Sequence, residues 1–268
     1  MFAATVHKTN YYKLLEKNSA FGSVKFILEC CQKLECKTIQ IIFKKPNINF
    51  VNYDVYFIVK PSTFAHAASI FHRVYGNLGR VDYDKFAIAT ASIFLASKVN
   101  EDPIRLKDII NVSQVTLNRQ DTLNEMTNNS WLLSIRDTIV QCEMFIMRVL
   151  NFSPYTQLPH PFLLNYINTL ENWLPKEWLS ITPLSKCAMS LLQDFYYSQH
   201  VVSYSAEKIA TAVLVLTFQI YGIKIPLIDD LDNWYKLFSP DMKVEHVWEI
   251  IDEILKVFDL EENLKDFL

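Results

Sequence analysis

The spacing of apolar residues predicts helices along most of the chain. Residues 23–34 carry apolar side chains at positions 24, 27, 28, 31 and 34, which lie on one face of an α-helix. Pro61, Ser62 and Thr63 are typical of a helix start. Further helical patterns cover residues 61–76, 84–99, 108–112 and 131–150. The sequence therefore predicts five helices before residue 153.

Prolines at positions 154, 159 and 161 interrupt this pattern in the segment NFSPYTQLPHP and mark a linker. After it, five more helices are predicted, at residues 161–172, 182–198, 205–221, 233–238 and 243–258. The expected fold is therefore all-α, with an N-terminal unit at residues 1–153 and a C-terminal unit at residues 154–268.

Part of the first unit recurs in the second unit at a constant offset of 121 residues. VDYDKFAIATASIFL at residues 81–95 is similar to VSYSAEKIATAVLVL at residues 202–216. Asp84 and Ser205 hold the same place in the two copies, and both residue types can cap a helix N-terminus. Alanines such as Ala89 and Ala210 keep the next helix narrow, so neighbouring helices can approach it from several sides. The chain therefore looks like two copies of one helical unit, each with a central helix. The identical positions are Val81/Val202, Tyr83/Tyr204, Ile88/Ile209, Ala89/Ala210, Thr90/Thr211, Ala91/Ala212 and Leu95/Leu216.

Residues 41–60, IIFKKPNINFVNYDVYFIVK, fit neither a helical period nor a recognisable turn. β-Branched and aromatic residues dominate both ends, which makes a two-stranded excursion one alternative. Loops of this length are uncommon inside compact helical units. The segment is either an exposed inserted loop or an artefact of the gene model, such as a translated intron.

The composition argues against several classes of function. Only 4 of 268 residues are glycine, which disfavours glycine-rich phosphate loops. No apolar run reaches the roughly 20 residues that span a bilayer. The five cysteines form no CxxC pair, so neither a zinc site nor a disulfide framework is expected. His66 and His72 are interpreted as structural or exposed side chains, not as metal ligands. The expected location is intracellular.

Charge is unevenly distributed between the two units. Residues 1–153 contain 18 basic and 13 acidic side chains, whereas residues 154–268 contain 8 lysines, no arginine and 16 acidic side chains. A nucleic-acid binder built from two such repeats would be expected to carry a basic stripe along both. The acidic second unit therefore argues against direct nucleic-acid binding.

Three segments in order, FLASKVNED closing the third helix, DIINVS at residues 108–113 and CEMFIMRVLNF at residues 142–152, resemble the cyclin family. The resemblance covers residues 20–258 apart from the 41–60 segment. RDTIVQCE, LPHPFLLNYI and NWYKLF are most similar to cyclin Q, a relative of the transcription-associated cyclins. The resemblance implies two tandem five-helix cyclin boxes.

The function implied by this resemblance is that of a regulatory subunit, not an enzyme, with no cofactor and no metal. Cyclins bind a cyclin-dependent kinase and hold its C-helix inward, so that the kinase's own catalytic groups assemble. The resemblance to cyclin Q implies cyclin-dependent kinase 10 as the partner and the nucleus as the location. No membrane partner is implied.

The resemblance also implies that Lys98 and Glu143 lie at the kinase-facing surface, bonded to each other and to the kinase, with Glu101 beside them. Independently, Lys98 ends an apolar helix, where the helix dipole favours a cation. Glu143 stands on the apolar stripe of Ile139 and Ile146, where a carboxylate needs a partner. The alternative interpretation is an internal Lys–Glu bridge that only fastens the third helix to the fifth.

Two departures from the cyclin pattern limit the comparison. Asn100 stands where many cyclins have an acidic residue, and SVKFILECC lacks the substrate-docking motif that cell-cycle cyclins carry on their first helix.

Two other classes of function are alternatives to the cyclin role. A basal transcription factor of the TFIIB type also has tandem cyclin-like repeats but binds DNA and has a zinc ribbon, and a helical enzyme would need a convergent polar cluster that the sequence lacks.

Overall fold

The computed structural model describes residues 20–42, 61–78, 83–118, 129–171, 183–223 and 234–265. All regular secondary structure in these ranges is helical, which confirms the predicted all-α fold. The chain divides into two compact units, Met1–Thr156 and Gln157–Leu268. None of the described helices is both long and apolar enough to cross a membrane.

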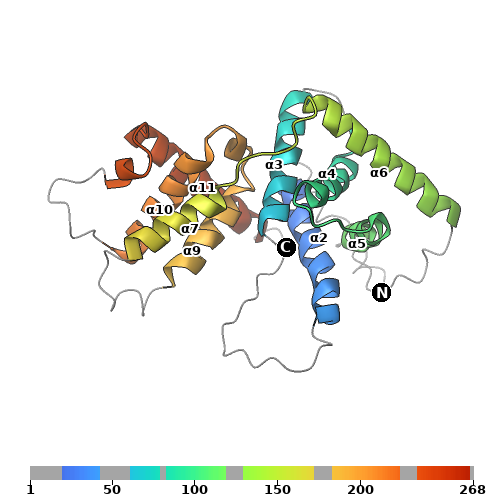
Figure 1. Ribbon diagram of the computed structural model, residues 1–268, viewed down its shortest axis with the longest axis horizontal. Helices are drawn as coiled ribbons and strands as arrows, with labels where there is room; N and C mark the ends of the chain where they lie inside the picture. The colour runs from blue at the N-terminus through green and yellow to red at the C-terminus, as the bar shows by residue number, and fades with distance from the viewer. Residues whose placement is uncertain are drawn as a thin grey trace. The chain divides into compact units, whose positions relative to one another are not determined.

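The central helix of the first unit is α4 (Lys85–Val99), whose side chains from Ile88 to Ser97 are nearly all buried. It packs against each of the four other helices described in this unit (Figure 1). Ala89 is fully buried, which agrees with the predicted close approach of neighbouring helices. The surrounding helices are α2 (Phe21–Ile42), α3 (Pro61–Leu78), α5 (Leu106–Asn118) and α6 (Asn129–Val149).

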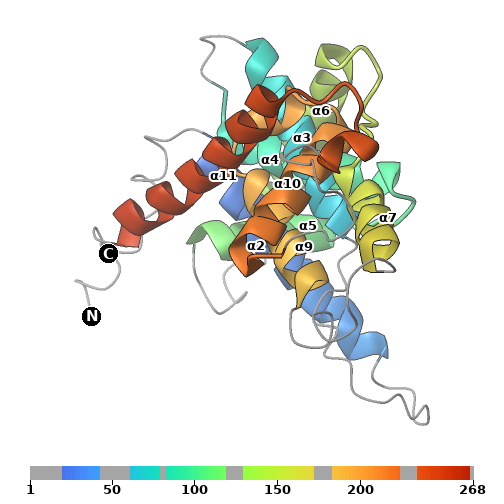
Figure 2. The ribbon, with the colours of Figure 1, turned by 90° about the vertical axis from the view of Figure 1, so that its left-hand side faces the viewer.

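The second unit repeats this plan around α10 (Ala206–Tyr221), where Ala210 is fully buried. Figures 1 and 2 show α10 among the other described helices of this unit, and each of these α-helices packs against it. These are α7 (Pro159–Glu171), α9 (Leu184–Phe195) and α11 (Val244–Lys265). Two short 3₁₀ helices, η1 (Gln199–Val202) and η2 (Trp234–Leu237), complete the described elements.

The two central helices share details of their hydrogen bonding. The hydroxyl of Thr90 donates to the carbonyl oxygen of Phe86 at 2.7 Å, and that of Thr211 donates to Glu207 at 2.8 Å. These four residues obey the same 121-residue offset. One expectation is wrong: Asp84 caps α4 through its carboxylate, but Ser205 stands at the N-cap of α10 without a side-chain capping bond.

Several predicted boundaries also differ from the observed ones. Pro159 begins α7, so the linker is shorter than the three prolines indicated, and proline is well tolerated in a first helical turn. The helix predicted at residues 233–238 is the short 3₁₀ helix η2, not an α-helix. α2 runs on to Ile42, so the 41–60 segment begins inside a helix, and residues 43–60 lie outside the described ranges.

Candidate functional site

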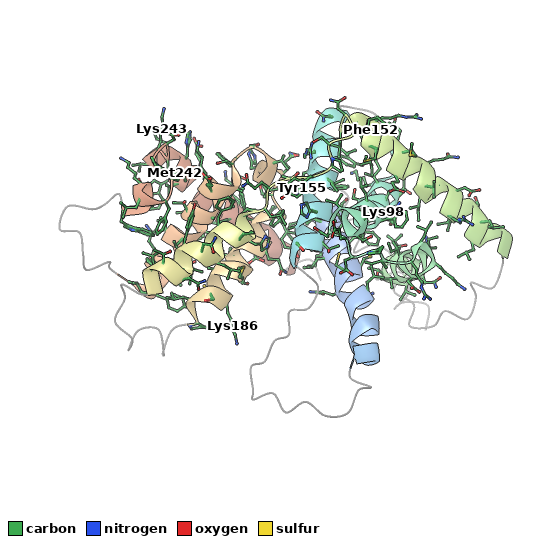
Figure 3. The ribbon with its side chains drawn as sticks, viewed as in Figure 1. Lys98, Phe152, Tyr155, Lys186, Met242 and Lys243 are labelled. Carbon is green, nitrogen blue, oxygen red and sulfur yellow. The ribbon has the colours of Figure 1, made fainter. Side chains whose placement is uncertain are left out.

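Lys98 and Glu143 meet on the surface of the first unit, from the last turn of α4 and the middle of α6. The ammonium of Lys98 donates to both carboxylate oxygens of Glu143, at 2.7 and 2.9 Å. The Lys98 side chain is 45% exposed and that of Glu143 is 12% exposed. The Lys98 nitrogen also lies 3.9 Å from the centroid of the Phe94 ring, close enough for a cation–π contact. The pair is therefore held in place while its cation stays open to solvent. Figure 3 labels Lys98 in the first unit.

Glu101 closes α4 in a left-handed backbone conformation, with φ at 55°. Its N–H donates to the carbonyl of Lys98 at 3.1 Å, and the N–H of Asp102 donates to Ser97 at 2.9 Å. This pair of bonds is the Schellman motif, in which glycine is the usual left-handed residue. A glutamate there is strained, because its Cβ crowds the following carbonyl oxygen. At the equivalent place in the second unit, 121 residues later, Gly222 closes α10 with φ at 63°.

Asn100 joins the end of α4 to the start of α3. Its amide donates to the hydroxyl of Thr63 at 3.1 Å. Next to it, the buried ring of His66 has Nδ1 3.0 Å from the carbonyl oxygen of Ser62 and Nε2 3.0 Å from that of Thr156. The Asn100 amide can donate to the Thr63 hydroxyl oxygen whichever way the hydroxyl proton points, whereas a carboxylate could only accept from it. The asparagine that replaces the acidic residue of many cyclins therefore has a structural use here.

Burial lowers the pKa of His66, although its contacts with the two backbone carbonyls and with Asn100 oppose this effect. A neutral imidazole has one N–H and donates to only one carbonyl at a time. Arg73 reaches the same loop, donating to the hydroxyl of Thr156 at 3.1 Å and to the carbonyl of Ser153 at 3.0 Å. The segment after α6 is thereby tied to α3, and His66 is structural, which is one of the two roles expected for it.

Exposed apolar side chains line the outer face of α6 beside Glu143. Leu133, Val140 and Met144 are all exposed, and their spacing of seven and four residues places them on one face of the helix. Sequence reasoning identified only the opposite stripe, which contains the buried Ile139 and Ile146. The missed signal was a second apolar stripe on a helix that already had a core-facing one.

Two cysteine thiols of the first unit have raised pKa values. Burial raises the pKa of the Cys30 thiol to about 12 and also raises that of Cys142 on α6. A thiol with a raised pKa is a poor nucleophile, because the thiolate is the reactive form. Among the described residues, no group of three or more histidine, cysteine or acidic side chains could hold a metal ion.

Comparison with known proteins places most of this surface in a recognised domain. Residues 49–153, which include Lys98, Glu101 and Glu143, match the family Cyclin, N-terminal domain. Cyclin-T1 of Homo sapiens is 22% identical over 213 residues, covering 76% of this chain and 27% of the relative. Cyclin-L1 of Homo sapiens is 25% identical over 191 residues, covering 70% of this chain and 34% of the relative. The chain thus spans about a quarter to a third of the length of these curated relatives.

A solved structure resembles nearly the whole chain. It is a chain of the yeast RNA Pol II CTD kinase CTDK-1 complex, with a TM-score of 0.65 and 16% sequence identity, covering 94% of this chain and 73% of that chain. At this identity the likeness establishes the fold and no more.

Proposed function

We propose that this chain, which its sequence relates to the cyclin family, is a non-catalytic regulatory subunit that binds and activates a cyclin-dependent serine/threonine kinase. The match of residues 49–153 to the cyclin N-terminal domain supports this role. So does the resemblance of the fold to a chain found in a CTD kinase complex. Activation would follow from fixing the kinase C-helix in its inward position.

The observation that carries the proposal is the Lys98–Glu143 pair, bonded through both carboxylate oxygens but only partly covered. An ammonium has three N–H donors, and Glu143 accepts from two, so one is left for a backbone carbonyl of the kinase. The carboxylate has further lone pairs that accept from backbone N–H groups. A charge pair of this kind suits the segment that leads into the kinase C-helix.

The exposed stripe of Leu133, Val140 and Met144 would supply the apolar part of the same interface. Stable protein interfaces combine an apolar centre with a polar rim, and a paired charge gives orientation more than affinity. Glu101 would add a second carboxylate at the end of α4. These roles make Lys98, Glu143 and Glu101 the proposed kinase-binding residues.

The proposed kinase belongs to the transcription-associated group, because Cyclin-T1 and Cyclin-L1 are among the relatives. The motifs that resemble cyclin Q support cyclin-dependent kinase 10 as the specific partner and the nucleus as the location. Affinity purification of the tagged chain, followed by mass spectrometry of the bound kinase, tests this finer assignment. Recovery of a different cyclin-dependent kinase would overturn the assignment while leaving the regulatory role intact.

Glu143→Ala tests the interface directly. In the free protein the change should cost less than about 1 kcal/mol, because a partly exposed ion pair contributes little to stability. In the complex it should weaken kinase binding by about 2–5 kcal/mol, because the remaining charge is left unpaired at a closed interface. Isothermal titration with purified kinase and a melting curve of the free chain measure the two quantities.

Lys256→Ala is the matched control, since it removes ion pairs of 2.8 and 3.0 Å in the second unit. It should leave kinase binding unchanged. Lys98→Ala should resemble Glu143→Ala, and the double variant should be less than additive because the two side chains share one contact. If Glu143→Ala binds the kinase normally but melts at a much lower temperature, the pair is an internal brace and the proposed interface is wrong.

A further inference from the structure

The second unit contains an open apolar groove of about 330 Å³ at the end of its central helix. The groove is bordered by the last turns of α10, by η2 and by the start of α11, which follows Met242 and Lys243 in Figure 3. Two indole rings line it: Trp234, which stacks on Phe218 at 5.2 Å, and Trp248, which is 53% exposed. The other lining residues are Val215, Phe218, Ile223, Tyr235, Val244 and Val247, with Gln219 and Gly222.

The groove continues along α11 as a second apolar stripe. Val247, Ile250 and Ile254 face the core and are buried. Trp248 and Leu255, seven residues apart, lie on another face, and Leu255 is 49% exposed. Seven residues of α-helix span about 10 Å, which separates these two apolar contacts. A single exposed leucine is ordinary, but a tryptophan and a leucine in line with a cavity form a surface that suits a ligand.

Acidic side chains run beside this stripe. Glu245, Glu249 and Asp252 are exposed, and with Trp248 and Leu255 they border a shallow extension of the groove on α11. Asp252 pairs with Lys256 at 2.8 Å, so Glu245 and Glu249 supply the negative charge of this face. The whole second unit has 8 lysines, no arginine and 16 acidic residues, a net charge of −8. The surface therefore selects for a ligand that carries positive charge next to apolar groups.

The internal repeat gives a second reason to regard this groove as a docking place, and this reason rests on the proposed role of Lys98 and Glu143. At the 121-residue offset, Gln219 corresponds to Lys98 and Gly222 to Glu101. Both Gln219 and Gly222 line the groove. The groove thus stands at the same place in the second copy that the Lys98–Glu143 pair holds in the first, but without a cation. The end of the central helix is accessible in both copies, but it carries a lysine in the first copy and a neutral glutamine in the second.

We propose that this groove binds a short segment of a partner protein in which apolar anchor residues are flanked by lysine or arginine. One anchor enters the cavity beside Trp234 and Trp248, and a second contacts Leu255. The basic side chains of the segment lie along Glu245 and Glu249. In an extended segment, anchors three positions apart span about 10 Å, which matches the distance along α11.

A fluorescein-labelled synthetic peptide of about 12 residues tests this proposal, with two leucines three positions apart and lysine or arginine at the flanking positions. Fluorescence anisotropy with the full chain measures its dissociation constant at low and at high salt. Binding should weaken as salt rises, because part of the attraction is between exposed charges. A peptide with the basic residues changed to glutamate and one with the leucines changed to serine serve as probes of charge and anchor.

Trp248→Ala should weaken binding of the basic peptide at least about tenfold, since a tryptophan in a pocket is a frequent energetic centre of an interface. Glu245→Gln combined with Glu249→Gln should weaken it less and reduce its dependence on salt. Leu164→Ser is the matched control, because Leu164 is also an exposed leucine of the second unit but lies on α7, away from the groove. This control should bind as the unaltered chain does.

Three results would overturn the proposal. The first is equal binding of the basic and the glutamate-substituted peptides, which would indicate general apolar adhesion. The second is equal loss of binding in Leu164→Ser and Trp248→Ala. The third is a concentration-dependent dimer in light scattering that Trp248→Ala converts to a monomer, because a second copy of the chain would then occupy the groove. None of these measurements uses a kinase, so a failure of this proposal can be distinguished from a failure of the regulatory function proposed above.

Discussion

The left-handed conformation of Glu101 leads to the prediction that Glu101→Gly will stabilise the free protein. A residue with a Cβ loses about 1–2 kcal/mol in this conformation, whereas glycine does not. Glycine also enlarges the unfolded ensemble, at a cost of about 0.4–1 kcal/mol. The net gain should be about 0.5–1 kcal/mol. In a chain of this size, that corresponds to a rise of about 1–4 °C in melting temperature.

Gly222→Ala supplies the matched control at the equivalent position of the second unit. Gly222 has a φ of +63°, and an added Cβ would meet no atom within 4 Å. The substitution therefore introduces backbone strain without a steric clash, and it should lower stability by about as much as Glu101→Gly raises it. Differential scanning calorimetry of the two variants beside the unaltered chain measures both effects.

Kinase binding separates strain from function. If Glu101 contacts the kinase, Glu101→Gly should bind it more weakly although the free chain is more stable, and Glu101→Gln should lose binding without a change in stability. If Gly222→Ala is destabilised as expected but Glu101→Gly is not stabilised, the turn at Glu101 holds no strain and the reasoning is wrong. If both variants at Glu101 bind the kinase normally, Glu101 is not part of the interface.

The remaining predictions concern the two cores, their caps and one histidine. Ala89→Leu and Ala210→Leu should each cost about 1–3 kcal/mol or more by overpacking a central helix, and tolerance of both in urea unfolding would contradict their fully buried positions. Asp84→Ala should cost about 1 kcal/mol and Ser205→Ala almost nothing, because only the Asp84 side chain makes a capping bond; equal losses would refute this difference. The pKa of His66 lies below the ordinary value of 6.5, so unfolding takes up a proton as pH falls from 6.5 through the lowered pKa, and stability falls with it. His66→Gln should flatten this part of a melting-temperature profile against pH, and an unchanged slope would exclude His66 as its source.

The helices could be predicted from the sequence, because burying one face of a helix requires apolar residues at a regular spacing of three or four positions. α3 and α4 begin and end within a few residues of their predicted bounds. The pairing of Lys98 with Glu143 was expected from the family resemblance and from the cost of placing a carboxylate on an apolar stripe. Both inferences rest on contacts that almost any cyclin-like packing of α4 against α6 would preserve.

Features that depend on local backbone geometry could not be predicted in this way. The serine at position 205 has the right residue type for a cap, but capping requires its hydroxyl to reach an N–H, and here no such bond forms. The left-handed φ of Glu101 was equally hidden, because glutamate is not a residue that favours it. The exposed stripe of Leu133, Val140 and Met144 required knowing which face of α6 contacts the core.

Departures from the internal repeat separate what the two copies need for folding from what they need for binding. Thr90 and Thr211 are identical and make the same bond inside their helices, as expected of residues that serve the fold. Lys98 and Gln219 differ although they occupy the same place, and each lies at an open surface. Because the fold tolerates either residue there, we attribute the difference to the partners proposed for the two surfaces. Exchanging Gln219 for lysine should therefore leave stability nearly unchanged and weaken binding of a basic peptide at the groove, since it adds a like charge.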